Sequence, residues 1–225
     1  MLNSSPSCQT PSSNNLIIVG AGGHAREVAW VAGEAKVKWH LIGFLDDKSL
    51  SQEQTNFGVR VLGGVADWPK HSHASFVIAI GSPRVRRDVL KRMLELGTPR
   101  FATIVHRSVI HAPEVRIGEG SMVMAGCVLS TNIQVGCHAI LNQSITAGHD
   151  SNIEDFCTLA PRVTLSGNVK IRQGGELGTA VCVRQGLTIG RGAMVGMGSV
   201  VIRDVGDNEL VLGVPARFTR KLDPF

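Results

Sequence analysis

The chain has 225 residues, of which 43% are hydrophobic and 18% are charged, an ordinary balance for a globular protein of one or two domains. The net charge of +5 comes mostly from dispersed basic residues, so we do not expect a nucleic-acid-binding protein. No apolar run reaches the roughly twenty residues that a membrane span requires. The five cysteines include no C-x-x-C pair, which indicates reduced thiols and a cytoplasmic location.

Residues 1–14 are rich in Ser, Pro, Asn and Thr, with neither a basic start nor an apolar stretch. This composition is typical of a disordered tail rather than of a signal peptide. We therefore expect the first folded domain to start at residue 15.

An aliphatic strand over residues 16–19 leads directly into a glycine loop, residues 20–25, and then into a helix predicted over residues 26–35. The loop reads G-x-G-x-x-A, from Gly20 through Gly22 to Ala25. Glycines at a strand-to-helix turn let a phosphate approach the backbone and the helix N-terminus. The motif predicts a nucleotide site, although an ordinary tight turn without a ligand remains the alternative.

A second strand, predicted over residues 39–45, ends at Asp46 and Asp47, where dinucleotide-binding folds place an acid for a ribose hydroxyl. An extended segment, 59–64, a strand, 75–80, and a helix, 84–96, follow. This alternation predicts a small doubly wound α/β domain, Rossmann-like but only half as long as a full dinucleotide site needs. The helix carries Arg84, Arg86, Arg87, Lys91 and Arg92, which we expect on a solvated face opposite Val85, Val89, Met93 and Leu96.

From residue 117 onward an aliphatic residue returns at every sixth position, a spacing that neither a single helix nor a single strand produces. The position four residues after each member is uncharged, which gives two inward positions per hexad. Between them lies a column with turn chemistry, mostly Gly, Asn, Asp and Ser. The pattern predicts short strands joined by regular turns, that is, a parallel β-helix of hexapeptide repeats. The column is Ile117, Val123, Leu129, Val135, Leu141, Ala147, Ile153, Leu159, Leu165, Ile171, Leu177, Val183, Ile189, Val195 and Val201.

Three hexads make one coil, so residues eighteen apart are expected to stack at about 4.8 Å. By this rule His149 lies below Gly167, which has no side chain to crowd an imidazole. Asp150 follows His149 and could orient it as a base. A surface histidine at a corner is the alternative for His149, and Asp150 also occupies a turn position where Asp is favoured in any case.

These motifs give the chain a clear resemblance to the nucleotide-sugar acetyltransferases of the hexapeptide-repeat family, which include bacillosamine, perosamine and sialic acid acetyltransferases. The resemblance covers nearly all residues after 15. The matching segments are G-A-G-G-H-A at 20–25, F-L-D-D at 44–47, A-I-G at 79–81, A-G-H-D at 147–150, S-G-N-V at 166–169 and G-V-P-A at 213–216.

The resemblance implies a left-handed β-helix, although spacing alone says nothing about handedness. It also implies a homotrimer that binds acetyl-CoA between neighbouring subunits. We expect a Rossmann-like nucleotide-sugar-binding domain over residues 15–104, the β-helix acyltransferase domain over 105–206, and a C-terminal extension over 207–225. No metal is expected.

The family's catalytic base falls on His149, with Asp150 as the acid beside it. Asn142 matches an asparagine near the sugar amine. The substrate-binding residues implied are Gly20, Gly22, Gly23, His24, Asp46, Asp47, Gly64 and Gly81. Acetyl-CoA contacts carry over to Gly167, Thr179 and Met197, and to Thr158, which stands where relatives commonly have a second histidine.

Thr179 and Met197 stack on a different corner from His149 and Gly167, so the two groups can line one cleft only if another subunit contributes. The activity expected is N-acetylation of a nucleotide-linked 4-amino-4,6-dideoxy sugar by direct transfer. O-acetylation of a sugar or sialic acid hydroxyl is the main alternative. A non-catalytic trimeric scaffold that binds nucleotide sugars is another, and a zinc carbonic anhydrase using His111, His138 and His149 is a remote one.

Overall fold

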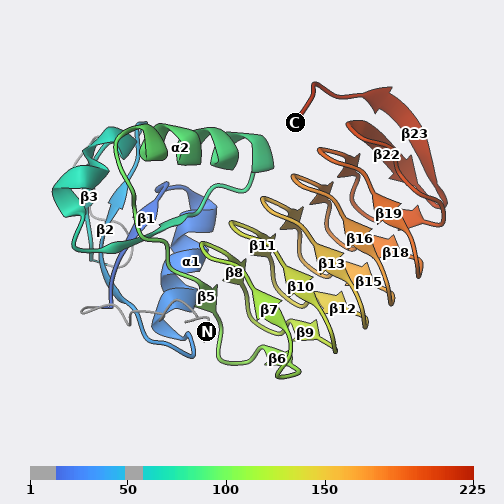
Figure 1. Cartoon of the computed structure of the whole chain (residues 1–225), viewed down its shortest axis with the longest axis horizontal. Coiled ribbons are helices and arrows are strands. Elements are labelled where there is room, and N and C mark those ends of the chain that lie inside the picture. Colours follow the sequence, from blue (N-terminus) through green and yellow to red (C-terminus); the bar gives the residue numbers. More distant parts are fainter. Residues whose placement is uncertain (1–13, 49–57) are drawn as a thin grey trace, which may run out of the picture.

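The computed structural model describes residues 14–48 and 58–225, so most of the predicted N-terminal tail, residues 1–13, lies outside the described residues. An α/β unit and a stack of regular coils lie side by side, and the helix α2 (Pro83–Glu95) runs along the top of the α/β unit with one end at the coils (Figure 1). Within the described part of the chain, no helix combines the length and apolar character needed to cross a membrane.

The α/β unit is built on a four-stranded parallel sheet in the order β3-β2-β1-β4. Its strands are β1 (Asn15–Val19), β2 (His40–Leu45), β3 (Val61–Gly63) and β4 (Ser75–Ile78). The helix α1 (Gly23–Gly33) follows β1, and a 3-10 helix, η1 (Val65–His71), follows β3. The helix α1 begins three residues earlier than predicted, immediately after Gly22, so the glycine loop contributes to its first turn.

The helix α2 corrects one sequence-based expectation, because Arg86 does not lie on a solvated face. The buried residues of α2 are Pro83, Arg86, Val89 and Met93, whereas Val85 and Leu96 are about half exposed. Arg86, Val89 and Met93 follow the three- and four-residue spacing of one helix face. Val89 and Met93 are therefore buried as predicted, whereas the prediction is wrong for Val85, Leu96 and Arg86, because it places every arginine of this helix in solvent.

The coil region consists of two-residue strands in three sheets, as the sixfold spacing predicted. One sheet, here called the polar sheet, contains β7 (Arg116–Ile117), β10 (Gln134–Val135), β13 (Asn152–Ile153), β16 (Lys170–Ile171) and β19 (Thr188–Ile189). A second, the uncharged sheet, contains β6 (Ile110–His111), β9 (Val128–Leu129), β12 (Thr146–Ala147), β15 (Thr164–Leu165), β18 (Cys182–Val183) and β21 (Val200–Val201).

The third sheet, the docked sheet, packs against the α/β unit. Its strands are β5 (Ile104–Val105), β8 (Met122–Val123), β11 (Ile140–Leu141), β14 (Thr158–Leu159), β17 (Glu176–Leu177), β20 (Met194–Val195), β22 (Glu209–Gly213) and β23 (Ala216–Lys221). The last two form an antiparallel hairpin at the end of the stack. Met122, Met124 and Ile140 share one hydrophobic cluster with α1 and β1, which joins the two parts of the molecule.

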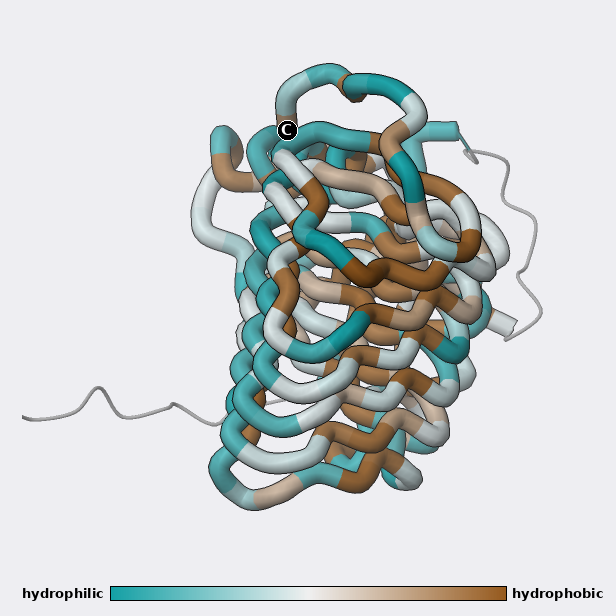
Figure 2. The backbone as a smooth tube through the Cα atoms, turned by 90° about the vertical axis from the view of Figure 1, so that its right-hand side faces the viewer, coloured by the Kyte–Doolittle hydropathy of each residue, from teal (hydrophilic) through white to brown (hydrophobic). Residues whose placement is uncertain are grey.

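Residues eighteen apart pair throughout the coils, as in Gln134 with Asn152 and Thr146 with Thr164. Every turn-column residue from Gly120 to Gly198 has a positive φ, including the bulky Phe156 and Arg162. The inward column is buried, and its hydrophobic segments align from coil to coil (Figure 2). Together these features give the left-handed parallel β-helix that the resemblance implied.

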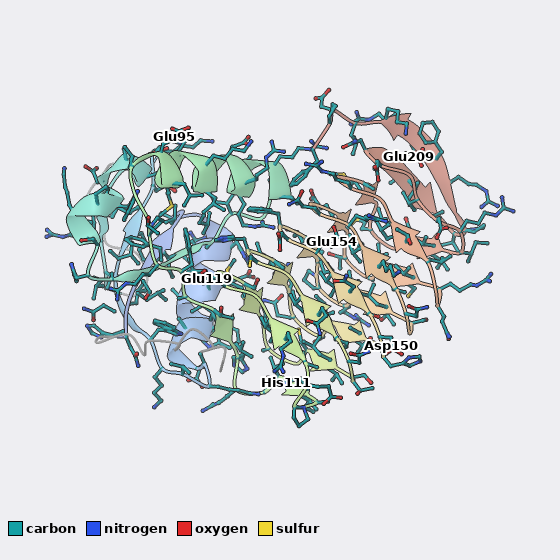
Figure 3. The ribbon with its side chains drawn as sticks, in the orientation of Figure 1. Glu95, His111, Glu119, Asp150, Glu154 and Glu209 are labelled. Carbon is teal, nitrogen blue, oxygen red and sulfur yellow. The ribbon has the colours of Figure 1, made fainter. Side chains whose placement is uncertain are left out.

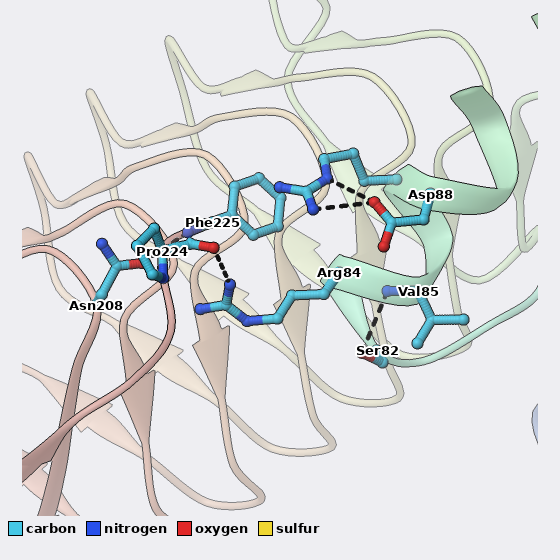
Figure 4. Close-up of polar contacts among 8 residues, drawn as sticks. Ser82, Arg84, Val85, Asp88, Asn208, Pro224 and Phe225 are labelled. Atoms are coloured by element: carbon cyan, nitrogen blue, oxygen red, sulfur yellow. Dashed lines mark hydrogen bonds and ion pairs between the residues drawn. The ribbon is translucent and has the colours of Figure 1, made fainter. Parts of the chain in front are cut away.

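Residues 222–225 lead back from the hairpin to the start of α2 (Figure 4). The Pro224 carbonyl accepts a hydrogen bond from Arg84 Nη1 at 2.7 Å, and the Phe225 ring lies 4.6 Å from the Arg87 guanidinium. Phe225 is buried against Gly174 and Gly192, where any side chain would overlap its ring. The last coil and the α/β unit are therefore held together by a second contact.

His138 replaces a small turn residue and is buried between Phe156, which stacks on it, and Phe101, which meets it edge-on. Burial, reinforced by the charge of Arg86, lowers the pKa of His138 to about 4. His138 therefore becomes protonated near pH 6.5 in the unfolded chain but only near pH 4 in the folded chain. The free energy of unfolding falls as the pH drops through this window.

We expect the free energy of unfolding to lose about 3 kcal/mol from this group between about pH 7 and about pH 4. Urea unfolding of the wild type and of a His138→Asn variant at both pH values measures this loss. Asparagine is chosen because it tolerates the left-handed backbone of this position. Equal losses in the two proteins would show that His138 does not carry this pH dependence.

Candidate active site: a glycine-loop cavity and a coil corner

The glycine loop forms the wall of a cavity of about 440 Å³ at the carboxyl ends of β1, β2 and β4. Gly20 needs its positive φ of 103° and lies so close to β4 that a side chain there would press on the Ala79 carbonyl. The cavity brings together most of the predicted substrate residues, namely Gly20, Gly22, Gly23, His24, Asp46, Asp47 and Gly81. Gly64 is not part of its lining but lies behind Asp47, and Asn142 is on the coils instead.

The N-terminus of α1 opens into this cavity. Within the described part of the chain, no side chain caps it and its first turn contains no acid. Backbone N–H groups that lack partners, together with the positive end of the helix dipole, favour an anion such as a phosphate at this place.

Asp46 and Asp47 shape the cavity through bonds to the chain itself. Asp46 accepts from the backbone N–H groups of Ala21 and Lys48, each at 2.7 Å. Asp47 accepts from the Val65 N–H at 2.8 Å and pairs with Arg92 at 2.9 Å. The Val65 hydrogen bond is the main cause that lowers the pKa of Asp47. Both acids thus fix loops around the cavity, and the ribose role predicted for them stays a prediction.

His24 presents one ring nitrogen to the cavity region. Its Nδ1 lies 3.2 Å from the Glu27 carboxylate, which can only accept, so Nδ1 carries the proton. Burial is the main cause that lowers the pKa of His24, so the ring is neutral near pH 7. Nε2 is buried and finds no hydrogen-bond partner among the described residues. It is therefore an acceptor that meets no donor within residues 14–48 and 58–225.

The second part of the site is the corner of the coils that follows the uncharged sheet. His149 Nδ1 lies 2.8 Å from Asp150 Oδ2, and both side chains are about half exposed. Asn132 donates to the other Asp150 oxygen at 2.6 Å, and this bond is the first cause that lowers the pKa of Asp150, ahead of His149. The carboxylate orients the ring and leaves Nε2 as the basic nitrogen.

Gly167 lies against the His149 ring, as the eighteen-residue rule predicted, and a Cβ there would overlap Nε2. In Figure 3, Asp150 projects from the edge of the coils away from α2 and from Glu95. The basic nitrogen therefore faces an open surface that only a glycine leaves clear.

Sequence reasoning missed Asn132, although the eighteen-residue rule places it directly below Asp150.

Thr179 and Met197 lie on the opposite edge of the uncharged sheet, in the turns that follow β17 and β20. Met197 is 75% exposed, and Thr179 is half-buried. Asn142 lies on this corner as well, and its amide donates to the Leu159 carbonyl at 2.9 Å. The structure thus keeps this group apart from His149 within one chain.

Thr158 joins neither group. It is buried beneath the α/β unit, where its hydroxyl donates to the Gly81 carbonyl at 2.7 Å and accepts from Arg86 at 2.9 Å. Its predicted contact with acetyl-CoA therefore finds no support in its position.

Among the described residues, no group of three or more His, Cys, Asp or Glu side chains is arranged to hold a metal ion.

Comparison with known proteins connects this geometry to characterised enzymes. Residues 15–93 match the family model described as the PglD N-terminal domain. The GDP-perosamine N-acetyltransferase of Escherichia coli O157:H7 is 29% identical, over 89% of this chain and 94% of the relative.

Two solved structures are similar over 92% of this chain. The acetyltransferase domain of PglB from Neisseria gonorrhoeae, in complex with acetyl coenzyme A, is 31% identical and fully covered, with a TM-score of 0.85. PerB from Caulobacter crescentus, in complex with CoA and GDP-perosamine, is 30% identical and 97% covered, with a TM-score of 0.83.

Proposed function

The chain belongs to the hexapeptide-repeat nucleotide-sugar acetyltransferases, and from this premise we propose that it acetylates the amine of a nucleotide-linked 4-amino-4,6-dideoxy sugar. It is an acetyl-CoA-dependent enzyme. The observation that carries the proposal is the combination, on one chain, of a glycine-lined nucleotide cavity and the His149–Asp150 pair at an open coil corner. The cytoplasmic location predicted from the cysteines stays a prediction.

The proposed reaction is direct transfer between the two bound substrates. The sugar nitrogen attacks the thioester carbonyl carbon, and His149 Nε2 accepts the proton that the nitrogen gives up. The C–S bond then breaks, and CoA leaves as the thiol after the proton has passed to its sulfur. Asp150 keeps the Nδ1 proton in place, so that Nε2 is the atom that takes up the proton from the amine and then gives it to the sulfur.

We further propose that three copies form the site, because the residues assigned to it lie on both edges of the uncharged sheet. The outward residues of this sheet carry no charge over the whole stack, and Ile110 is 66% exposed. They are Ile110, Val128, Thr146, Thr164, Cys182 and Val200. The polar sheet instead exposes Arg116 and Lys170, and the α/β unit covers much of the docked sheet.

Packing one uncharged sheet against another copy buries apolar surface without burying a charge. It also brings the Thr179 and Met197 corner of one copy toward the His149 and Gly167 corner of its neighbour. Acetyl-CoA bound in that cleft would meet contacts from both subunits.

The substrate assignment is tested with UDP-, GDP- and dTDP-linked 4-amino-4,6-dideoxy sugars, supplied with acetyl-CoA while free thiol is measured. We expect thiol release with one nucleotide series, and little with the matching sugar that carries a 4-hydroxyl group. Release only with the hydroxyl acceptor would replace the proposal with O-acetylation. Nucleotide-sugar binding without thiol release from any acceptor would favour the non-catalytic scaffold.

A further inference from the structure

Arg86 joins the nucleotide cavity to the coils although it belongs to neither catalytic group. Its side chain is fully buried. Nη1 donates to the carbonyls of Ile80 and Gly81, two residues that line the cavity. Nε and Nη2 reach across to the coils, where they donate to the carbonyls of His138 and Phe156, at 2.8 and 2.6 Å.

A buried charge is costly unless its donors are satisfied. Burial lowers the pKa of Arg86 to about 10, so the guanidinium remains charged near pH 7. Among the described residues it forms no ion pair, and backbone carbonyls with one hydroxyl take its hydrogen bonds instead. This acceptor set exists only while the α/β unit is seated on the coils.

Thr158 completes the junction from the side of the coils. Its hydroxyl donates its one hydrogen to the Gly81 carbonyl and accepts from Arg86 Nη2. The Gly81 carbonyl therefore receives one hydrogen bond from Arg86 and one from Thr158. A valine at position 158 has nearly the same shape but can make neither bond.

We propose that Arg86 and Thr158 are positioning residues that fix the Ile80–Gly81 edge of the nucleotide cavity to the coil stack. The pair thereby holds the bound nucleotide sugar in a set place relative to the acyl-transfer corners. This inference rests on the proposed function, and it assigns Thr158 to the nucleotide side of the reaction rather than to acetyl-CoA.

Three variants test the inference: Thr158→Val, Thr158→Ser, and Thr188→Val as a matched control at an outward position of the polar sheet. We expect Thr158→Val to raise KM for the nucleotide sugar about 3- to 10-fold, since one partly buried hydrogen-bonding group is lost. KM for acetyl-CoA should change less than about 2-fold, because the lost hydrogen bond lies at the edge of the nucleotide cavity. Thr158→Ser keeps the hydroxyl and should restore the wild-type KM, and Thr188→Val should leave both constants unchanged.

A rise in KM for acetyl-CoA at an unchanged KM for the nucleotide sugar would overturn the inference, because it would place Thr158 on the cofactor side. Thr158→Val kinetics equal to those of the wild type would overturn it as well. The Arg86→Lys variant keeps the charge but loses the planar fork, so it should weaken nucleotide binding more than Thr158→Val does. Thermal unfolding of each variant shows whether it is folded. If Arg86→Lys does not fold, the Thr158→Val kinetics alone decide whether the inference holds.

Calorimetric titration with UDP, GDP and dTDP separates this inference from the proposed function, because it requires no turnover. If the wild type binds one of them and Thr158→Val binds it more weakly, the inference holds whatever the acceptor proves to be. If both bind it equally well, the inference alone fails. A wild type that binds none of the three overturns the proposed function and this inference together.

Discussion

A His149→Ala variant should lose acetyl transfer by about 10²- to 10⁴-fold in kcat, the range that a positioned general base contributes. The ring has no structural role that would make its removal destabilising, since it is half exposed and its side chain bonds only to Asp150 among the described residues. Steady-state rates with saturating sugar and acetyl-CoA measure the effect. KM values close to those of the wild type would place the loss in the chemical step.

The Gly167→Ala variant tests the same nitrogen without removing it. An added methyl group at this position would overlap the His149 ring, so we expect the ring to be displaced and kcat to fall by about 10- to 100-fold. Gly33→Ala is the matched control, because a methyl group there meets no atom within contact distance. Full acetyl transfer by His149→Ala would remove His149 from the mechanism altogether.

A Thr164→Glu variant is expected to dissociate the proposed trimer and to abolish most of the activity with it. Thr164 lies at the middle of the uncharged sheet, where a carboxylate would be buried against a neighbouring copy at a cost of several kcal/mol. Analytical ultracentrifugation should give three times the chain mass of 24.0 kDa for the wild type, and the single mass for the variant.

The Thr188→Glu substitution places the same charge on the polar sheet and should change neither mass nor rate. If Thr164→Glu were a monomer with full activity, a single chain would contain the whole site. If the wild type itself were a monomer, the two groups of residues could not meet as proposed.

The coil region was predictable almost residue by residue. A side chain's place in a β-helix depends only on its position within the hexad and on the number of coils, both of which can be counted along the chain. The pairing of Thr146 with Thr164 and the contact of Gly167 with His149 follow from that count. The positions of the glycine loop and of Asp46 at the ends of their strands were predictable for a similar reason, since a strand, a tight turn and a helix lie within a few residues of each other.

The failures concern contacts between segments that are distant along the chain. Arg86 was expected in solvent because arginine is usually exposed, and no local pattern indicates acceptors that lie 70 residues away. The motif that suggests an acetyl-CoA contact for Thr158 gives no sign of the bond from its hydroxyl to Gly81, 77 residues earlier. The turn-column position of His138 was correct, whereas its burial between two aromatic rings depends on where the α/β unit is seated.

The sequence by itself determined the two kinds of structure in this chain, the glycine loop of the proposed nucleotide site and the stacking of Gly167 over His149. All of these depend on periodicity or on neighbouring residues. Only the tertiary structure decided how the α/β unit is seated on the docked sheet, and hence which polar groups form hydrogen bonds at that junction. The reason is physical, because a buried arginine or threonine takes its role from the acceptors that folding brings to it, and those acceptors have no fixed spacing along the chain.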